Sequence, residues 1–477
     1  MMRSWKGKDV TRVKQSYHLA TECFLLKRGS LLMAYFPKRG EVLAINREAW
    51  RFLARLKAAG ADRKRLTAAE QAIVRQLDQM KLIARGGIPP PRKASVVTRP
   101  TAYAPTRVAL LLTNRCNLRC RYCYSMAGST PRAELSLEAA LAAVDLIVEN
   151  AKRAGESAAL VLHGGGEPSC AWSLLKAVVE HFESRAREAQ IKTLTAIATN
   201  GVIPLDRLAW LAEHVQDFCI SLDGPPEIQD RQRPKAGGAG SYEDVARTFT
   251  YLDNHGKRYF VMATVTSESV GSLTGLVPLL AGRSGCCGVL LAPVYECGYG
   301  TKSVSQPKAD DFIKACRLID AAARPAGLSA WYIGARSHML VDHWCDATAA
   351  NTSFDVTPEG LVSCCYMVTE PSDPRAKLFL HGKYDVTSGQ YVFDPAAQAR
   401  LRSRSIETIP ACRDCFCKYN CGGGCLNQAP GLYKVNRYRC RLNRTLTMDQ
   451  LVDALRTGAA KTARVARKAG KPVVKIS

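Results

Sequence analysis

Apolar residues in the middle of the chain follow two patterns: short continuous runs, and stretches in which they recur three and four positions apart. The runs predict buried strands, and the second pattern predicts amphipathic helices. We expect strands at 107–112, 158–162, 193–198, 217–221, 259–265 and 288–292, with helices between them, for example at 137–153, 172–187 and 242–255. This repetition predicts an α/β fold with a parallel sheet. Six units are too few for an eight-stranded barrel, so we expect a partial (β/α)6 barrel.

The first hundred residues follow a different pattern, with strands before helices. Strand-like segments at 23–26, 31–35 and 42–45 precede helical segments at 47–58 and 67–80. Thr67-Ala-Ala-Glu70 has the sequence of a capping box, which predicts the start of the second helix. The stretch 86–105, with three consecutive prolines, predicts a linker.

Shifts in composition divide the chain into predicted units. These are a winged-helix-like unit at 1–95, a linker at 96–105, the partial barrel at 106–300, a helical bridge at 301–344, a cysteine-rich unit at 345–441, and a helix with a basic tail at 442–477. Each of the larger units is long enough to bury a core of its own.

Three cysteines, Cys116, Cys120 and Cys123, follow the first predicted strand with the spacing CxxxCxxC. Three thiolates on a short loop can hold three irons of a [4Fe–4S] cluster and leave the fourth iron without a protein ligand. A zinc site would more often be closed by four ligands in paired units. Active sites of parallel α/β folds lie at the carboxyl ends of the strands, where this loop is expected. We interpret it as a cluster site that is open for chemistry.

Polar residues end the next three predicted strands. Glycines in such positions let a backbone approach a ligand closely, a glutamate can accept from an ammonium group, and an arginine suits a carboxylate. The residues are His163 and the segment Gly164-Gly165-Gly166-Glu167-Pro168 after the second strand, Thr199 and Asn200 after the third, and Ser221 and Asp223 after the fourth, with Asp230 and Arg233 soon after.

This combination resembles the radical S-adenosylmethionine (SAM) superfamily over about residues 106–300. The resemblance implies that the three cysteines hold the cluster, with Tyr122 as the aromatic residue of the motif. It implies a SAM site made by Gly165, Gly166, Glu167, Thr199, Asn200, Ser221 and Arg233. Members of the superfamily cleave SAM reductively and abstract a hydrogen atom from an unreactive carbon. In one departure, the stretch 229–233 has Gln where many relatives have His.

A second cysteine array lies nearer the carboxyl end of the sequence and resembles the signature of the SPASM domain, which holds two auxiliary [4Fe–4S] clusters. The resemblance implies that Cys412, Cys415, Cys421 and Cys440 ligate one cluster and that Cys345, Cys365 and Cys425 ligate the other. Cys364 and Cys417 are candidates for the missing fourth ligand, or are incidental thiols. Otherwise one iron is open to a substrate thiolate. The expected cofactors are therefore three [4Fe–4S] clusters and SAM.

The composition of the chain predicts its location in the cell and the charge of its partner. The nineteen cysteines are accompanied by no signal segment and no apolar run that could span a bilayer, so we expect a reducing cytoplasm, where ligation is favoured over disulfides. The net charge of +25 predicts an acidic partner, and residues 458–477 predict a basic tail with six Lys or Arg residues and no acid. We expect an acidic peptide or small protein and an external electron donor, and neither a membrane nor nucleic acid.

The N-terminal unit resembles the recognition element of enzymes that mature ribosomally made peptides, which can accept an extended peptide as an added strand. A DNA-binding winged helix or a plain packing domain has the same pattern. The three units together resemble radical SAM/SPASM peptide maturases, and in order and length those of quinohemoprotein amine dehydrogenase.

The resemblance implies thioether cross-links between Cys sulfur and carbons of Asp or Glu. Candidate general bases are Asp223, Asp230, Glu296 and His163. Two other radical reactions stay open, carbon–carbon cross-linking and formylglycine formation. So does a non-enzymatic function as an iron–sulfur electron carrier or nucleic-acid-binding protein.

Overall fold

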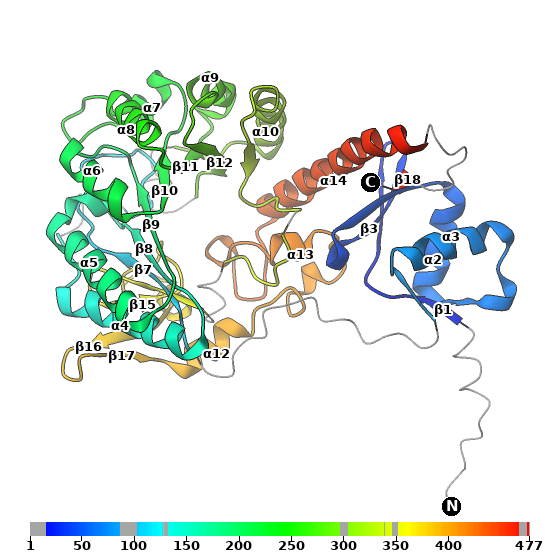
Figure 1. The fold of residues 1–477 in the computed structure, drawn as a ribbon, viewed down its shortest axis with the longest axis horizontal. Coiled ribbons are helices and arrows are strands. Elements are labelled where there is room, and N and C mark those ends of the chain that lie inside the picture. The colour runs from blue at the N-terminus through cyan, green and yellow to red at the C-terminus, as the bar shows by residue number, and fades with distance from the viewer. Residues whose placement is uncertain are drawn as a thin grey trace, which may run out of the picture.

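The computed structural model describes residues 16–85, 103–125, 127, 132–295, 304–337, 339–345, 352–466 and 475–476, with the backbone alone at 458–466 and 475–476. A larger lobe holds the parallel sheet and a smaller lobe holds the N-terminal unit (Figure 1). Helices α13 (Lys418–Cys421) and α14 (Arg437–Ala466) lie between them. None of the helices in the described ranges is long and apolar enough to cross a membrane.

The larger lobe is built on an eleven-stranded sheet in the order β13-β12-β11-β10-β9-β8-β7-β14-β15-β16-β17. All six predicted strands are present and parallel: β7 (Arg107–Leu111), β8 (Ala158–His163), β9 (Thr193–Thr199), β10 (Asp217–Ser221), β11 (Tyr259–Val265) and β12 (Cys286–Pro293). Two parallel strands that the sequence analysis missed extend the sheet on both sides, β13 (Ala330–Tyr332) and β14 (Ser353–Val356). The predicted α/β fold is confirmed.

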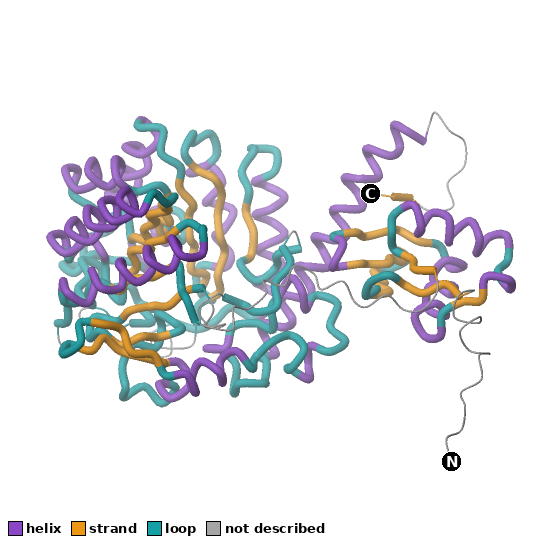
Figure 2. The backbone as a smooth tube through the Cα atoms, turned by 60° about the horizontal axis from the view of Figure 1, so that its bottom comes forward, coloured by secondary structure: helices purple, strands orange, loops and turns teal. Residues whose placement is uncertain are grey.

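Helices cover the outer face of this sheet (Figure 2). They are α4 (Leu137–Ala154), α5 (Trp172–Ala189), α6 (Leu205–His214), α7 (Pro226–Gln232), α8 (Tyr242–Asn254), α9 (Leu276–Leu280) and α10 (Ala309–Ala323). Side chains alternate along each strand, so Val108 and Leu110 are fully buried in the core beneath these helices. Ala109 and Val161 point to the opposite, inner face, where they line a cavity. The outer face of the sheet thus contributes to the core, and the inner face borders a cavity.

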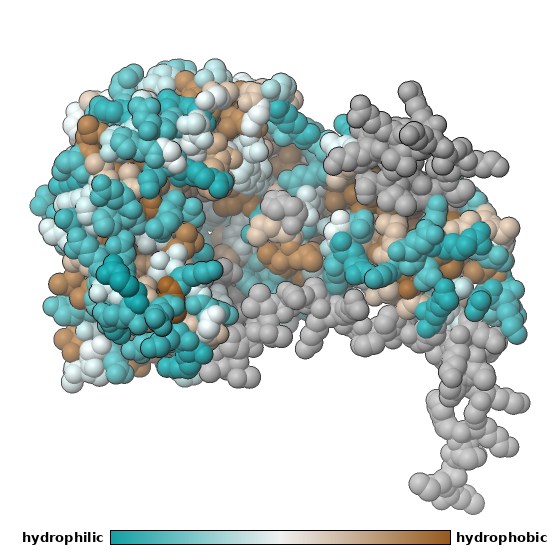
Figure 3. Space-filling model, in the orientation of Figure 1, coloured by the Kyte–Doolittle hydropathy of each residue, from teal (hydrophilic) through white to brown (hydrophobic). Residues whose placement is uncertain are grey.

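Antiparallel strands continue the sheet beyond β14. They are β15 (Leu361–Ser363), β16 (Leu380–Asp385) and β17 (Gln390–Phe393), and they are accompanied by the helices α11 (Ala376–Phe379) and α12 (Pro395–Arg402). The segment that carries the second cysteine array is therefore hydrogen-bonded into the same sheet as the predicted barrel. On the face seen in Figure 3, the surface of this lobe is predominantly hydrophilic with scattered apolar residues.

The smaller lobe contains the strands and helices expected there. A sheet of β2 (Phe24–Arg28), β3 (Leu31–Phe36) and β4 (Glu41–Ile45) packs beside α2 (Arg47–Ala59) and α3 (Ala68–Gln79). Three short strands, β1 (Ser16–Leu19), β5 (Ala61–Asp62) and β6 (Ile83–Arg85), form a second sheet. The predicted capping box is confirmed: Glu70 N–H donates to Thr67 Oγ1 (3.2 Å) and Thr67 N–H donates to Glu70 Oε2 (3.0 Å).

The glycine segment after β8 lies against the loop after β7. Gly166 N–H donates to Thr113 O (2.8 Å) and Glu167 N–H donates to Arg115 O (2.8 Å), next to the first cysteine. A Cβ atom at Gly166 would lie 1.9 Å from the Arg115 carbonyl oxygen, whereas a Cβ atom at Gly165 would meet nothing nearer than 3.8 Å. The close approach of the two backbones therefore requires glycine at position 166.

We predict that Gly166→Ala destabilises the protein, because the clash is with backbone and the cysteine loop must move. The expected loss is roughly 1–3 kcal/mol, against less than about 0.5 kcal/mol for the matched control Gly165→Ala. Chemical denaturation of both variants, followed by circular dichroism, provides the measurement. Equal midpoints for the two variants would show that the loops can separate without cost.

Candidate active site

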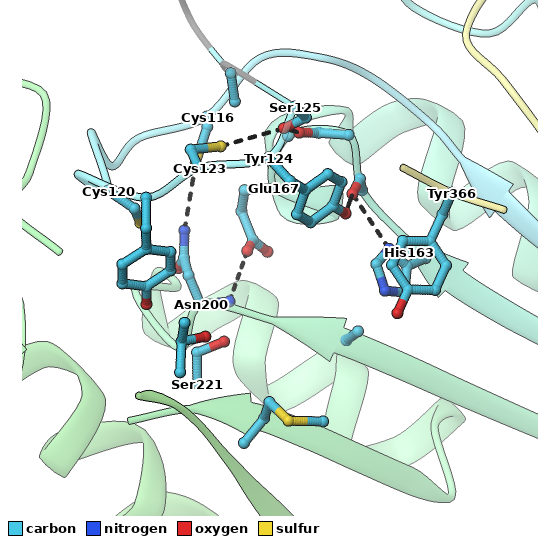
Figure 4. A pocket seen from close by; sticks show the side chains of 18 of the residues that line it. Cys116, Cys120, Cys123, Tyr124, Ser125, His163, Glu167, Asn200, Ser221 and Tyr366 are labelled. Carbon is cyan, nitrogen blue, oxygen red and sulfur yellow. Dashed lines mark hydrogen bonds between the residues drawn. The ribbon is translucent and has the colours of Figure 1, made fainter. Parts of the chain in front are cut away.

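A cavity of about 250 Å³ lies at the carboxyl ends of the parallel strands (Figure 4). It is lined by the three cysteines of the first motif and by all eight residues predicted to bind the cofactor: Tyr122, Gly165, Gly166, Glu167, Thr199, Asn200, Ser221 and Arg233. These residues come from the loops and ends of four neighbouring strands, which the parallel order brings to one edge.

The three thiols of the motif lie near hydrogen-bond donors. Leu118 N–H lies 3.4 Å from Cys116 Sγ and Arg233 Nη1 lies 3.8 Å from Cys120 Sγ, while Cys123 Sγ is 3.2 Å from Ser125 Oγ. Burial raises the pKa of Cys116 and of Cys120 to about 12, so as free thiols they hold their protons. Coordination to a metal centre supplies the positive charge that would stabilise their thiolates.

Glu167 joins the ends of β8 and β9. Its Oε1 accepts from Thr199 Oγ1 (2.9 Å) and Ser169 N–H (3.2 Å), and its Oε2 accepts from Asn200 N–H (2.8 Å). Burial raises the pKa of this carboxyl, and the three donors oppose that shift. A carboxylate has about four acceptor positions, so one remains for a ligand in the cavity.

Asp223 is a buried anchor behind the cavity. Its carboxylate accepts from Tyr122 Oη, from Gln232 Nε2 (3.0 Å), from Arg233 Nε (3.2 Å) and from Thr264 N–H (2.9 Å). Arg233 also lies over the Tyr122 ring, 5.4 Å from its centroid. Asp223 therefore orients two residues that line the cavity, and its own acceptor capacity is used.

The base candidates need correction, because the structure does not bring Asp223 or Asp230 to the cavity. Asp230 Oδ1 accepts from the backbone N–H groups of Ser241 and Tyr242 (2.8 Å each), which begin α8. Both carboxylates thus have structural partners, and neither lines the cavity. Glu296, like Cys297, lies outside the described residues. His163 does line the cavity, and burial lowers its pKa.

A second cavity of about 410 Å³ adjoins the first. Five residues line both: His163, Tyr295, Ile333, Tyr366 and Met367. The second cavity is lined by Cys345, Cys365 and Cys425, which are the predicted ligand set that lacks a fourth member. Cys364, a candidate for that fourth ligand, lines the same cavity. The rings of His163 and Tyr366 are stacked, with centroids 4.4 Å apart, at the boundary between the two cavities (Figure 4).

The other predicted set, Cys412, Cys415, Cys421 and Cys440, also forms a group. Burial, with further contributions from Cys415 and Cys440, raises the pKa of Cys412 to about 11, and burial raises that of Cys421 to about 12. Cys417 Sγ lies 3.4 Å from Cys415 Sγ and packs against the small lobe. Cys417 is therefore near the complete set of four cysteines. It is not near the set of Cys345, Cys365 and Cys425, which lacks a fourth ligand.

The sequence analysis missed a titratable residue in the second cavity. Asp355 on β14 faces this cavity beside Arg107 of β7, and it accepts from the Tyr366 backbone N–H. Burial raises its pKa to about 7, and Arg107 opposes the shift. The available signal was weak: Ser353-Phe-Asp-Val356 alternates polar and apolar residues, which is the pattern of a short strand with Asp355 on one face.

The donors fit the cofactors that the first motif implies. Three thiols on one wall can hold three irons of a [4Fe–4S] cluster. On the other walls, Glu167 can accept from an ammonium group, and Ser221 and Arg233 can donate to a carboxylate. These are the two charged groups on the α-carbon of the methionine part of SAM.

Comparisons with known proteins agree with this geometry. Residues 110–272 match the family model described as the radical SAM superfamily. The cysteine-type anaerobic sulfatase-maturating enzyme of Clostridium novyi is 26% identical over 159 residues, which is 33% of this chain and 42% of that protein. Similar curated relatives are matched over 27% to 57% of their own length.

Two solved structures have a similar fold. Native anSMEcpe with bound AdoMet has a TM-score of 0.58 at 17% identity, over 73% of this chain and 98% of that chain. Streptococcus suis SuiB bound to S-adenosylmethionine has a TM-score of 0.51 at 16% identity, over 89% of this chain and 99% of that chain. Residues 110–272 are therefore a radical SAM domain, in a chain that folds like these two proteins.

Proposed function

We propose that this chain is a radical SAM peptide maturase that forms thioether cross-links between a Cys sulfur and a carbon of Asp or Glu, as the maturases of quinohemoprotein amine dehydrogenase do. The observation that carries the proposal is the pair of adjoining cavities, one lined by the CxxxCxxC thiols and the other by a second set of thiols. A substrate carbon and a substrate sulfur can thus be held in adjoining cavities that share five lining residues.

Similar proteins support a peptide as the substrate. A relative is named the sporulation killing factor maturation protein of Bacillus subtilis, and anSMEcpe has been solved with a peptide. The described part of the N-terminal unit carries fourteen Lys or Arg residues against six Asp or Glu, which favours an acidic peptide.

When bound, the first cluster and SAM supply a 5′-deoxyadenosyl radical that removes a hydrogen atom from the substrate carbon. Glu167 and Arg233 orient the methionine part of SAM, and the buried Asp223 holds Arg233 in place. Cys345, Cys365 and Cys425 can hold an auxiliary cluster beside the substrate, and Cys412, Cys415, Cys421 and Cys440 can hold a second. Per cross-link, one hydrogen atom must leave the carbon, one proton must leave the thiol and one electron must leave the substrate. An auxiliary cluster held by these cysteines would supply an acceptor for that electron.

Asp355 is our choice for the residue that receives the thiol proton. It lines the second cavity together with the cysteines, whereas Asp223 and Asp230 accept hydrogen bonds from other protein groups. The only hydrogen-bond donor to its carboxylate within the described residues is the Tyr366 backbone N–H. The carboxylate can therefore also accept a proton from a substrate in that cavity.

Formylglycine formation is the alternative function, because two similar relatives are named sulfatase-maturating enzymes. The fold match to anSMEcpe leaves more than a quarter of this chain without a counterpart, while the match to SuiB leaves about a tenth. The present chain therefore has more residues outside the fold that it shares with anSMEcpe. Such an additional part favours a substrate that needs a separate docking surface.

The mass of a treated peptide tests the reaction. We expect that the reconstituted, reduced chain with SAM removes two hydrogens per cross-link from a Cys- and Asp-containing peptide encoded beside its gene, with one alkylatable thiol lost each time. A loss of hydrogens with all thiols intact would indicate carbon–carbon coupling instead. Loss of the sulfur with gain of an aldehyde would indicate formylglycine.

Iron analysis tests the number of clusters. Because each cluster contains four irons, we expect the double variant Cys412→Ala/Cys415→Ala to bind about four fewer irons than the unmodified chain. Cys316→Ala is the matched control, since this thiol is buried in α10 and belongs to no motif. An unchanged iron content in the double variant would show that these cysteines do not hold an auxiliary cluster.

Replacement of the candidate base separates proton transfer from radical formation. Asp355→Asn is expected to keep SAM cleavage and to lower cross-linking about 100-fold or more, the usual size of a general-base contribution. Glu359→Gln, an exposed change in the same hairpin, should leave both rates intact. A variant that loses SAM cleavage in parallel would show a structural role for Asp355.

A further inference from the structure

Two buried arginines lie beside the cysteine sets of the C-terminal part of the chain. Arg404 is 6% exposed and Arg439 is 3% exposed. Within the described residues, neither forms an ion pair with a carboxylate. A buried charge is costly unless a group of opposite charge lies near it, so both cations need a source of negative charge. The cysteines concerned are the complete set Cys412, Cys415, Cys421 and Cys440 and the incomplete set Cys345, Cys365 and Cys425.

Arg404 lies beside the turn that joins the two sets. Three glycines, residues 422–424, connect Cys421 of the complete set to Cys425 of the incomplete set. Arg404 Nη2 donates to two carbonyl oxygens of this turn, at 2.9 Å and 3.4 Å. Burial lowers the pKa of Arg404, and thiols of both sets oppose that shift, namely Cys412, Cys425, Cys421 and Cys345. Arg404 is therefore close enough to interact with the charge of either set.

Arg439 precedes Cys440 in the chain, near the start of α14. Its Nη2 donates to the carbonyl oxygen of Pro293 at the end of β12 (2.8 Å), and its guanidinium group lies 4.6 Å from the centroid of the Tyr295 ring. Its Nε and Nη1 are buried and have no hydrogen-bond acceptor within the described residues. Burial raises the pKa of Cys425, and Arg439 is among the groups that oppose this shift. Arg439 thus lies next to a member of one set in sequence and near a member of the other in space.

Thiolates of the two sets can supply the negative charge. Their sulfurs already have polar neighbours, since Asn443 Nδ2 lies 2.9 Å from Cys421 Sγ and Asn427 Nδ2 lies 3.5 Å from Cys365 Sγ. A [4Fe–4S] core with four thiolates is negatively charged, and its net charge and the hydrogen bonds to its sulfurs tune its reduction potential. A buried cation nearby favours the reduced form, which carries one more electron. The surroundings of both sets therefore fit clusters whose charge the two arginines balance.

We propose that Arg404 and Arg439 are a shared counter-charge for the two auxiliary clusters and that they raise the reduction potential of both. The inference rests on the auxiliary clusters of the proposed function, but not on its reaction or its substrate. A higher potential makes an auxiliary cluster a better acceptor for the electron that must leave the substrate. The two arginines act on the clusters through charge, without ligating iron or touching the substrate.

A redox titration followed by electron paramagnetic resonance tests the proposal. The reconstituted full chain carries Cys116→Ala, Cys120→Ala and Cys123→Ala, so that only auxiliary clusters give a signal. We expect Arg439→Met to disfavour one-electron reduction of an auxiliary cluster about tenfold or more, which is a shift of about 59 mV or more to lower potential. Arg439→Lys keeps the charge and should restore most of the potential. The matched control is Arg437→Met, an exposed change on the same helix, which should have little effect because water and salt screen that charge.

Equal potentials in Arg439→Met and Arg437→Met would overturn the proposal, and so would a shift that Arg439→Lys fails to reduce. Arg439→Gln, which is neutral and polar, is the second variant and should shift the potential in the same direction. If both neutral variants lose iron while Arg439→Lys retains it, the clusters need the charge, as proposed. If Arg439→Lys loses iron as well, the role of Arg439 is packing and the proposal fails.

The titration uses neither SAM nor peptide, so its outcome is independent of the mass test. Shifted potentials without cross-linking of any peptide would leave the counter-charge standing and overturn the reaction. Cross-linking with unshifted potentials would overturn the counter-charge alone.

Discussion

The carboxylate of Glu167 connects the strand ends on which the candidate site depends. It accepts from the hydroxyl of Thr199 and the backbone N–H of Asn200, and its own N–H donates to the carbonyl of Arg115, beside the first cysteine. Because the group is buried, loss of any of these partners would leave a polar atom without water to replace it. The sheet pairs β7, β8 and β9. Glu167 then ties the ends of β8 and β9 and the cysteine loop to one another.

The two faces of the large sheet have different roles. Its outer face carries aliphatic side chains that bury against helices, and residues of its inner face, such as Ala109 and Val161, line the second cavity. Beyond β7 the sheet continues through β14 into the antiparallel strands that bring Cys364, Cys365 and Tyr366 to the second cavity. Continuity of the hydrogen-bonded sheet explains how two cysteine arrays far apart in sequence come to line adjoining cavities.

Local patterns predicted much of this arrangement. The apolar runs identified all six central strands, and the polar residues after them line the first cavity as expected. The short edge strands β13 and β14 were missed, because runs of three or four residues carry little periodicity. The candidate bases Asp223 and Asp230 were misjudged for another reason. Their hydrogen-bond partners, such as Gln232 and Ser241, follow at intervals that no pattern reveals.

The sequence by itself determined the spacing of the cysteines, the order of strands and helices, and the excess of positive charge, since each depends on composition or on residues near one another along the chain. Only the tertiary structure decided which distant residues meet. It set Cys120 beside Arg233, Asp355 in a cavity with Cys425, and the strand 475–476 against β4. Such contacts follow from sheet order and from the path of the chain between elements, which no local pattern encodes.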